Sequence, residues 1–253
     1  MTLTGKHALV TGGGTGIGLA IAQILAREGA QVTITGRRMQ TLYDVSSKVG
    51  AEGLFPAMMD VTDETSVSAT VEATVAERGP IQICVANAGI AEGSTLRKTD
   101  MAFWQRIMAT NLDGAFLTIR ECFKSMRDTD WGRVIAISSI AGVRGLRGAG
   151  AYSASKHGVI GLIRSFSEEH INDPYTFNAL CPGYVETAIV HQNVARMKQK
   201  GMSREEALTK MLQSNRHARM IDTNEIAEAA LWLCAEGSKS VNGQAIEIAG
   251  GKV

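Results

Sequence analysis

The chain has 253 residues, of which 45% are apolar and 20% charged, and its formal net charge is +1. These values are typical of a globular protein and give its surface no overall attraction to nucleic acid or to membranes. No apolar run approaches the roughly 20 residues that a membrane span needs, and the first residues lack the apolar region of a signal peptide, so a cytoplasmic protein is expected.

Short apolar segments alternate with helical patterns along the whole chain. The expected strands cover residues 7–11, 31–35, 53–59, 81–86, 132–138, 175–181 and 244–248. Such alternation predicts parallel strands joined by right-handed helical crossovers, hence a doubly wound α/β sheet. Because no Pro/Ser-rich linker divides the sequence, residues 1–253 are expected to form a single domain.

The first expected strand leads into a glycine-rich loop that opens an apolar-periodic helix. The loop reads Thr11-Gly12-Gly-Gly-Thr-Gly16-Ile-Gly18, with GxxxGxG spacing. Glycines let a backbone approach a pyrophosphate without a Cβ in the way, and a helix amino end offers free N–H groups and a positive dipole. The context predicts a dinucleotide site. A tight turn without a ligand is the alternative.

The end of the second expected strand bears on the choice of cofactor. Gly36-Arg37-Arg38 stands where an acidic residue would bind the ribose 2′-hydroxyl of NAD. A guanidinium can instead receive a 2′-phosphate through paired, charge-assisted hydrogen bonds, which favours NADP(H) over NAD(H). Arg37 is the stronger candidate, since Arg38 can equally be a solvated helix-start residue.

An acid/base device for carbonyl chemistry is predicted around the fifth expected strand and the helix after it. Tyr152 and Lys156 are spaced to share one helix face, and Ser139 follows an apolar strand thirteen residues before Tyr152. A tyrosine with a pKa of about 10 needs a nearby cation to act as a base near neutrality. YxxxK also occurs by chance on surface helices, and Ser138 competes with Ser139, although a backbone-bonding role is the simpler reading of Ser138.

Further motifs follow in a fixed order: Asn87-Ala-Gly89 after the fourth strand, Asn111 after a helix, and Pro182-Gly183 after the sixth strand. With these, residues from about Lys6 to Gly251 closely resemble the classical short-chain dehydrogenase/reductase family. The resemblance implies a Rossmann-type fold and hydride transfer between NAD(P)(H) and a secondary alcohol or ketone.

The resemblance also implies roles for single residues. Tyr152 resembles the catalytic acid/base and Ser139 the hydroxyl that polarises the carbonyl, while Lys156 resembles the residue that lowers the tyrosine pKa and binds the nicotinamide ribose. Asn111 resembles a helix-kinking asparagine that holds a relay water, and Thr187 the residue that grips the nicotinamide carboxamide. Taken alone, Asn111 would be read as a helix cap or turn residue.

The implied cofactor site takes in the glycine loop and the ends of several strands. Asp60 and Val61 resemble the adenine contact, with a helix cap as the alternative for Asp60. Thr15 stands where some NADP-dependent members carry a second basic residue, so use of NAD(H) is also possible. The remaining members are Gly12, Gly14, Gly16, Ile17, Gly18, Asn87, Ala88, Gly89, Tyr152, Lys156, Pro182, Gly183, Val185 and Thr187.

Residues 140–150 and a helical lid over about 184–220 are expected to shape the substrate pocket. Basic residues outnumber acidic ones in the lid, which contains Arg196, Lys198, Lys200, Arg204, Lys210, Arg216 and Arg219 against Glu186, Glu205 and Glu206. Such a lid would attract coenzyme A or an acyl carrier protein, which favours a 3-oxoacyl thioester. A solvated face over residues 203–213 is the alternative. Met197, Met202, Met211 and Met220 form either an acyl-chain wall or ordinary lid packing.

Two other functions remain open: an NAD(H)-using dehydrogenase of neutral aryl or alicyclic alcohols, and a catalytically silent nucleotide-responsive binding protein. The four cysteines are expected to be buried free thiols, and the five histidines form no metal-ligand pattern. His157 and His191 could touch substrate, although solvated or packing roles are simpler.

The family resemblance implies a homotetramer or homodimer through the two long helices that end near Met126 and Ile171.

Overall fold

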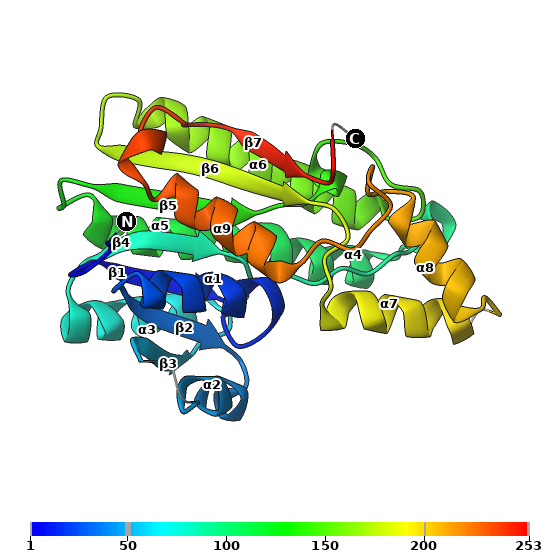
Figure 1. The fold of residues 1–253 in the computed structure, drawn as a ribbon, viewed down its shortest axis with the longest axis horizontal. Coiled ribbons are helices and arrows are strands. Elements are labelled where there is room, and N and C mark those ends of the chain that lie inside the picture. Colours follow the sequence, from blue (N-terminus) through cyan, green and yellow to red (C-terminus); the bar gives the residue numbers. More distant parts are fainter. Residues whose placement is uncertain (1, 49–51, 200, 252–253) are drawn as a thin grey trace.

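The computed structural model describes residues 2–48, 52–199 and 201–251, which contain a seven-stranded parallel sheet (Figure 1). Lys200, one of the basic residues expected in the lid, lies outside the described residues. The strands are β1 (His7–Thr11), β2 (Gln31–Gly36), β3 (Leu54–Met58), β4 (Ile81–Ala86), β5 (Gly132–Ile137), β6 (Tyr175–Pro182) and β7 (Ala245–Ile248). The expected strands are confirmed to within one residue at each end.

The sheet order is β3-β2-β1-β4-β5-β6-β7, with every neighbouring pair parallel. The chain first builds outward from β1 to β3 and then returns to build from β4 to β7 on the other side. The order therefore reverses between β1 and β4, and ligands of open α/β sheets bind beyond the carboxyl ends of the strands at such a reversal. The predicted Rossmann-type, doubly wound sheet is confirmed.

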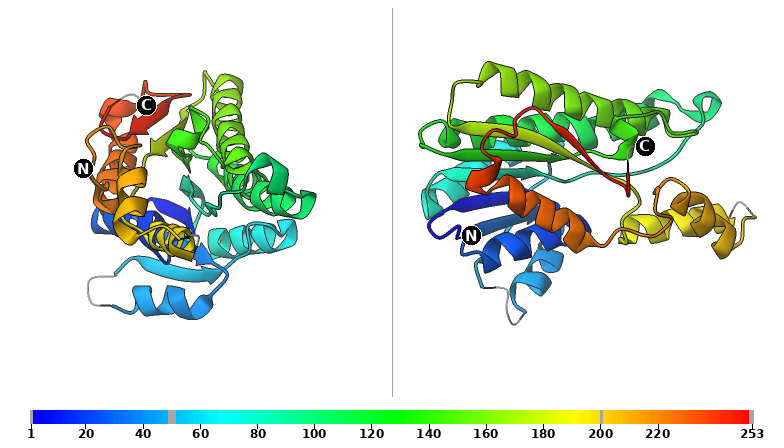
Figure 2. Two further views of the ribbon diagram at one scale, coloured as in Figure 1. Left: turned by 90° about the vertical axis from the view of Figure 1, so that its right-hand side faces the viewer. Right: turned by 45° about the horizontal axis from the view of Figure 1, so that its top comes forward.

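Helices cover both faces of the sheet. One face carries α1 (Gly16–Arg27), α2 (Met39–Ser46) and α9 (Thr223–Leu233), and the other carries α3 (Glu64–Arg78), α4 (Met101–Met108), α5 (Gly114–Met126) and α6 (Gly150–Glu169). Figure 2 (left) shows α1 and α9 on one side and α5 and α6 on the other. Short helical segments η1 (Leu96–Lys98), η3 (Ile140–Gly142) and η4 (Glu236–Ser238) fill connections.

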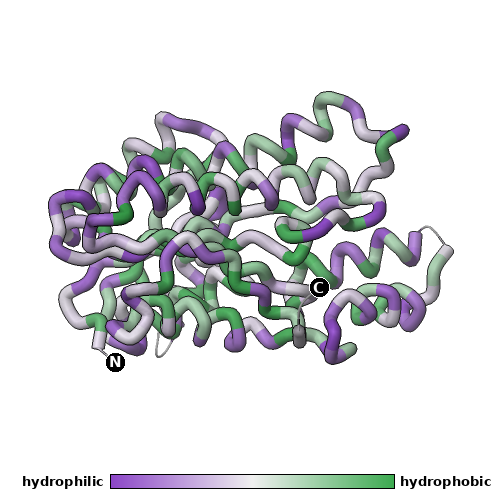
Figure 3. The backbone as a smooth tube through the Cα atoms, turned by 90° about the horizontal axis from the view of Figure 1, so that it is seen from above, coloured by the Kyte–Doolittle hydropathy of each residue, from purple (hydrophilic) through white to green (hydrophobic). Residues whose placement is uncertain are grey.

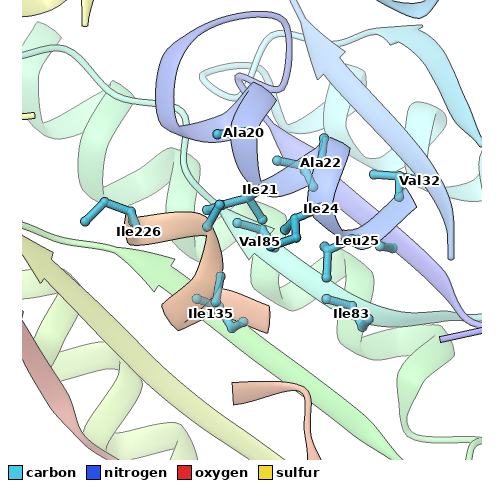
Figure 4. Close-up of a cluster of buried hydrophobic side chains, with 14 of the residues drawn as sticks. Ala20, Ile21, Ala22, Ile24, Leu25, Val32, Ile83, Val85, Ile135 and Ile226 are labelled. Carbon is cyan, nitrogen blue, oxygen red and sulfur yellow. The ribbon is translucent and has the colours of Figure 1, made fainter. Parts of the chain in front are cut away.

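Helix α1 is held in place by one of the two main apolar clusters. Its Ile21 and Leu25 side chains are fully buried against Ile83 and Val85 of β4, and Ile226 of α9 closes the cluster (Figure 4). Burying one such aliphatic side chain stabilises the fold by about 1.5–3 kcal/mol. This packing fixes the position of the glycine loop, because that loop leads directly into α1.

A second cluster lies on the opposite face and holds α5 and α6 against β4, β5 and β6. It includes Met126 of α5, Ile163 of α6 and Phe177 of β6, all fully buried. Since α6 carries Tyr152 and Lys156, this cluster sets the distance of their helix from the end of β5.

The segment between β6 and α9 contains α7 (Ala188–Gln199) and α8 (Arg204–Leu212) and projects beyond the carboxyl edge of the sheet (Figure 1). We call residues 184–220 the α7–α8 segment. It has a small apolar cluster of its own, in which Val190, Val194 and Met211 are buried. Hydrophilic and hydrophobic residues are mixed along the segment (Figure 3). Capping by Ser203 and Glu206 starts α8. In the described part of the chain, no helix is long and apolar enough to cross a membrane.

Candidate active site

The glycine loop between β1 and α1 is shaped by contacts within the protein. Gly12 and Gly16 have left-handed backbone angles, with φ of 64° and 55°, which glycine adopts readily. A Cβ on Gly18 would overlap the Asn87 amide nitrogen and the Gly12 carbonyl oxygen. Glycine is therefore required at position 18 by the packing of the loop on Asn87, in addition to any approach of a ligand.

The amino end of α1 fits an anionic group. Thr15 precedes the helix without a side-chain capping bond, and the first turn contains no acidic residue. Its N–H groups have the orientation and the helix dipole that favour a diphosphate. In the adjoining turn, a Cβ on Gly14 would lie 3.1 Å from a methyl group of Leu42 and 3.4 Å from the Thr41 methyl group, so there is little room for a side chain at position 14. The residues present thus fit the diphosphate of a dinucleotide.

A hydroxyl network joins the ends of β1 and β4 at the point where the sheet order reverses. The Thr11 Oγ1 accepts hydrogen bonds from the backbone N–H groups of Asn87 and Ala88, both at 2.9 Å. The Asn87 side chain donates back to the Thr11 carbonyl at 2.8 Å. Thr11 was not singled out from the sequence, although a hydroxyl residue at a strand end beside a glycine loop is a usable signal.

The adenosine side of the predicted cofactor site lies beyond β2 and β3. Arg37 and Arg38 are exposed, and Arg38 directly precedes α2, as the helix-start alternative for it supposed. The Asp60 carboxylate accepts hydrogen bonds from the Thr62 N–H and hydroxyl at 3.0 and 2.8 Å. These bonds, the backbone one above all, lower the pKa of Asp60, and the Arg37 cation lowers it further. The cap of α3 is Asp63, so Asp60 is not a helix cap.

A cavity of about 820 Å³ opens beyond the carboxyl ends of β4, β5 and β6. The predicted site residues that line it are Ile17, Asn87, Gly89, Ser139, Tyr152, Lys156, Pro182, Gly183, Val185 and Thr187. The other predicted cofactor residues lie outside its lining. They are Gly12, Gly14, Thr15, Gly16 and Gly18 of the loop, Arg37, Arg38, Asp60 and Val61 of the predicted adenosine side, and Ala88, which follows β4. The structure therefore brings the predicted catalytic residues into one cavity with the residues predicted to bind the nicotinamide half of the cofactor.

Ser139 and Tyr152 face each other in this cavity. Ser139 follows β5 and its Oγ accepts a hydrogen bond from the Ala141 N–H at 3.1 Å. Burial raises the pKa of Tyr152, and a hydrogen bond with the Ser139 hydroxyl acts in the opposite direction. The phenol consequently keeps its proton at neutral pH.

The resemblance implies that Lys156 lowers the pKa of Tyr152, but the structure gives the lysine a different partner. Its Nζ lies 5.9 Å from the centroid of the Tyr152 ring and donates a hydrogen bond to the Ile137 carbonyl at 2.8 Å. Burial lowers the pKa of Lys156 to about 8. Among the protein's own groups, Ser139 rather than Lys156 is the one that lowers the tyrosine pKa.

Asn111 lies in η2 (Ala109–Asp113), a π-helical turn between α4 and α5, so the helix is irregular at this residue. Its Oδ1 accepts from the Ile90 N–H at 2.8 Å, and its Nδ2 donates to the Ile90 carbonyl and to Ser155. A Cβ on Gly89 would lie 3.2 Å from Asn111 Oδ1 and 3.5 Å from Lys156 Nζ. Asn111 and Lys156 thus flank Gly89, and π-turns of this kind are frequent at functional sites.

Several simpler readings hold for the neighbouring residues. Ser138 donates to the Lys156 carbonyl at 3.0 Å, the backbone-bonding role considered for it. The exposed His157 bonds the Ser153 carbonyl, and His191 pairs with Glu186 at 2.7 Å; neither histidine lines the cavity. All four cysteines are buried and free, as expected. Across the described residues, no three His, Cys, Asp or Glu side chains are grouped to hold a metal ion.

Comparison with known proteins agrees with this geometry. The short chain dehydrogenase family matches residues 6–198. The chain belongs to this family. Like other short chain dehydrogenases it is an NAD(P)-dependent oxidoreductase that acts on alcohol or ketone groups.

Individual short chain dehydrogenases match over nearly the whole chain. An oxidoreductase of Bacillus subtilis named YxjF is 34% identical and covers 96% of both chains. The 3-oxoacyl-acyl-carrier-protein reductase MabA of Mycobacterium tuberculosis is 32% identical, with 97% of this chain and 92% of that protein covered. A variant of actinorhodin polyketide ketoreductase, crystallised with NADPH, has a TM-score of 0.92 at 31% identity and covers 99% of this chain and 98% of its own.

Asn215 is a positioning residue of this dehydrogenase that the sequence did not reveal. It is buried where the α7–α8 segment returns to the sheet, and its Oδ1 accepts from the Tyr184 N–H at 2.8 Å. Its Nδ2 donates to the carbonyls of Tyr184 and Arg219 at 3.0 and 2.7 Å. A bridge between Val185 and Ile221 lies beside it. Asn215 therefore ties together the two ends of the segment that carries part of the cavity wall.

Proposed function

We propose that this chain reduces ketones with NADPH and that a 3-oxoacyl thioester is its first substrate class. The proposal depends on one observation above all: Ser139, Tyr152 and Lys156 line the same cavity as Asn87, Gly89 and Thr187 of the nicotinamide side. An acid, a second hydroxyl and a cation thereby meet where the reacting end of the cofactor would lie.

NADP(H) is the proposed cofactor, with NAD(H) as a possible substitute. Arg37 is exposed and acts electrostatically on Asp60, so it stands on the adenosine side with a guanidinium free to receive a 2′-phosphate. The glycine loop and the start of α1 would hold the diphosphate. Lys156 would bind the nicotinamide ribose, and Thr187 the carboxamide. When bound, the nicotinamide supplies the hydride for reduction or accepts it in the reverse direction.

The residues of this chain would then handle the proton. Ser139 donates a hydrogen bond to the carbonyl oxygen and stabilises the negative charge that develops there. Tyr152, protonated because burial raises its pKa, transfers its proton to that oxygen while the carbonyl carbon gains the hydride, so the C=O group becomes CH–OH. The phenolate regains a proton from solvent through Lys156, beside which Asn111 would position a water.

The substrate class is supported by the relatives. The cavity of about 820 Å³ has to hold the nicotinamide as well as the substrate, and relatives named as 3-oxoacyl or polyketide ketoreductases match over nearly the full length. A second candidate, a dehydrogenase of neutral aryl or alicyclic alcohols, is favoured by the Met197, Met202 and Met211 side chains in the lining. A silent binding protein is disfavoured, since Ser139, Tyr152 and Lys156 are all present.

Oligomeric state and location stay predictions from the sequence. The homotetramer or homodimer rests on the family resemblance of α5 and α6.

The test is NADPH oxidation with acetoacetyl-coenzyme A beside ethyl acetoacetate, repeated with NADH. Our proposal predicts turnover of both ketones with NADPH, a higher kcat/KM for the thioester, and weaker use of NADH. A preference for the neutral ester would favour the second candidate, and no turnover of any ketone or alcohol would contradict the proposed activity.

A further inference from the structure

The rim of the cavity carries a set of cations that the proposed chemistry does not use. Lys98 comes from η1, Arg147 from the loop before α6, and Arg196 and Lys210 from α7 and α8. All four residues line the cavity and are nevertheless exposed, whereas Ser139 and Lys156 are buried. The four cations therefore stand at the mouth and the reacting groups lie deeper.

Three of these cations have no acidic partner within the described part of the chain. Among the described residues, no carboxylate forms an ion pair with Lys98, Arg147 or Lys210. Like charges brought to one mouth from three separate segments repel one another. An anion placed between them would relieve that repulsion.

Glu92 is the single carboxylate in the described cavity lining, and it does not neutralise these three cations. Arg106 of α4 binds it with two hydrogen bonds of 3.0 and 2.9 Å. The Arg106 hydrogen bond lowers the pKa of Glu92, so the carboxylate stays charged and paired with Arg106. Arg196 lies farther away, at 3.4 Å from the same carboxylate. Glu92 thus balances the two arginines and leaves Lys98, Arg147 and Lys210 uncompensated.

The basic residues of the α7–α8 segment thus fall into two groups, one inside the cavity lining and one outside it. Arg219 is bound to Glu225 by two hydrogen bonds of 2.6 and 2.8 Å, away from the cavity. Lys198 and Arg204 are exposed outside the lining. Of the described basic residues of the segment, those that line the cavity are Arg196 and Lys210, and Lys98 and Arg147 from outside the segment line it as well.

We infer that Lys98, Arg147 and Lys210 form a subsite for an anionic group at the end of the substrate remote from its carbonyl. The inference rests on the proposed function for the position of the carbonyl beside Tyr152, but the subsite itself does not require turnover. The ligand chemistry is a phosphate or a carboxylate. A phosphate would belong to the pantetheine arm of a thioester, and a carboxylate to a free oxo acid with a spacer between its two ends.

The test measures binding by calorimetry, in the presence of saturating NADPH so that the nucleotide site is not available to the probes. Pantetheine and 4′-phosphopantetheine differ only by the phosphate, and adipate supplies carboxylates on an aliphatic spacer. The test protein carries Lys98→Gln, Arg147→Gln and Lys210→Gln. The matched control carries Lys198→Gln, Arg204→Gln and Lys239→Gln, which remove the same number of positive charges from exposed positions outside the lining.

For a pantetheine ligand, the unsubstituted protein is expected to bind the phosphorylated probe about tenfold more tightly than pantetheine. The test variant should lose this preference, and the control should keep it. Sensitivity of adipate binding to the same variant, without a phosphate preference, would assign the subsite to a free oxo acid. Equal losses in both variants, or no affinity for either anion, would overturn the inference. The proposed reduction is checked separately by turnover of the neutral N-acetylcysteamine thioester of acetoacetate.

Discussion

Asn215 binds both the N–H and the carbonyl of Tyr184, with hydrogen bonds of 2.8 and 3.0 Å across 31 residues of chain. This pair fixes the first residues after β6 in the orientation in which Tyr184 and Val185 line the cavity. A Cβ on the preceding Gly183 would overlap Asn215 Oδ1, so the two chain segments are in direct contact.

Replacing Asn215 should therefore affect stability and substrate binding together. Asn215→Ala leaves the Tyr184 N–H without its hydrogen-bond partner, whereas the Tyr184 carbonyl keeps its bond from the Ile221 N–H. The free energy of unfolding is expected to fall by about 2 kcal/mol. The KM for the ketone should rise more than the KM for NADPH. Urea unfolding and steady-state kinetics measure both effects, with the exposed Asn224→Ala as control. Unchanged unfolding in Asn215→Ala would contradict the positioning role.

The adjacent serines Ser138 and Ser139 offer a matched pair of substitutions. Ser139→Ala removes the hydroxyl that faces Tyr152 and is expected to lower kcat by roughly 100-fold. It also removes the hydrogen bond from the Ala141 N–H, at a stability cost of about 1 kcal/mol. Ser138→Ala removes a buried hydrogen bond to the Lys156 carbonyl, at a stability cost of about 1 kcal/mol, and should retain most of the turnover. Reversed kinetic effects would show that the catalytic hydroxyl has been assigned to the wrong serine.

Substitutions of the neighbouring residues Arg37 and Arg38 test whether the protein distinguishes NADPH from NADH. Arg37→Ala is expected to weaken NADPH binding by about 10- to 100-fold through loss of a charge-assisted bond to the 2′-phosphate, while NADH binding changes little. Arg38→Ala, at the start of α2, serves as the control. Fluorescence titration with each nucleotide gives the two affinities. Equal losses for NADPH and NADH in Arg37→Ala would rule out the phosphate contact.

The buried Lys156 should make stability depend on pH. In the unfolded chain the lysine keeps its proton up to a pKa of about 10.4, whereas in the folded protein burial lowers this pKa to about 8. Between these values the unfolded state binds more protons, so stability rises with pH. The stability of the natural protein relative to Lys156→Met is expected to increase by about 1 kcal/mol from pH 8 to pH 9.

Urea unfolding of both proteins at pH 7, 8 and 9 measures this difference. Taking the difference removes most of the opposite contribution of buried thiols such as Cys181, whose pKa is raised to about 11. A difference that stays constant across the three pH values would contradict the lowered lysine pKa.

The sheet and the position of the chemistry could be predicted because both depend on local signals. The local signals are apolar runs, glycines and the strand ends near Gly12, Ser139 and Pro182, all of which can be recognised in the sequence. Parallel topology then brings these strand ends to one edge of the sheet. The roles of Asn215 and Glu92 could not be predicted in this way. Their partners lie 31 and 14 residues away, and polar residues in such loops resemble solvated ones until the fold buries them.

The direction of the Tyr152 pKa shift also lay beyond the sequence. Helical spacing brings Lys156 to the same face as Tyr152, but the local path of β5 gives its Nζ the Ile137 carbonyl as a partner. Burial, a property of the whole fold, then decides the direction for Tyr152.

The most direct test of the account is Tyr152→Phe, in which only the hydroxyl is lost. NADPH-dependent reduction of ethyl acetoacetate and the NADPH dissociation constant are measured on the same preparation. We predict that kcat falls by at least about 100-fold while the dissociation constant changes by less than about threefold. Turnover close to that of the natural protein, with the cofactor still bound, would contradict the assignment of Tyr152 as the proton donor.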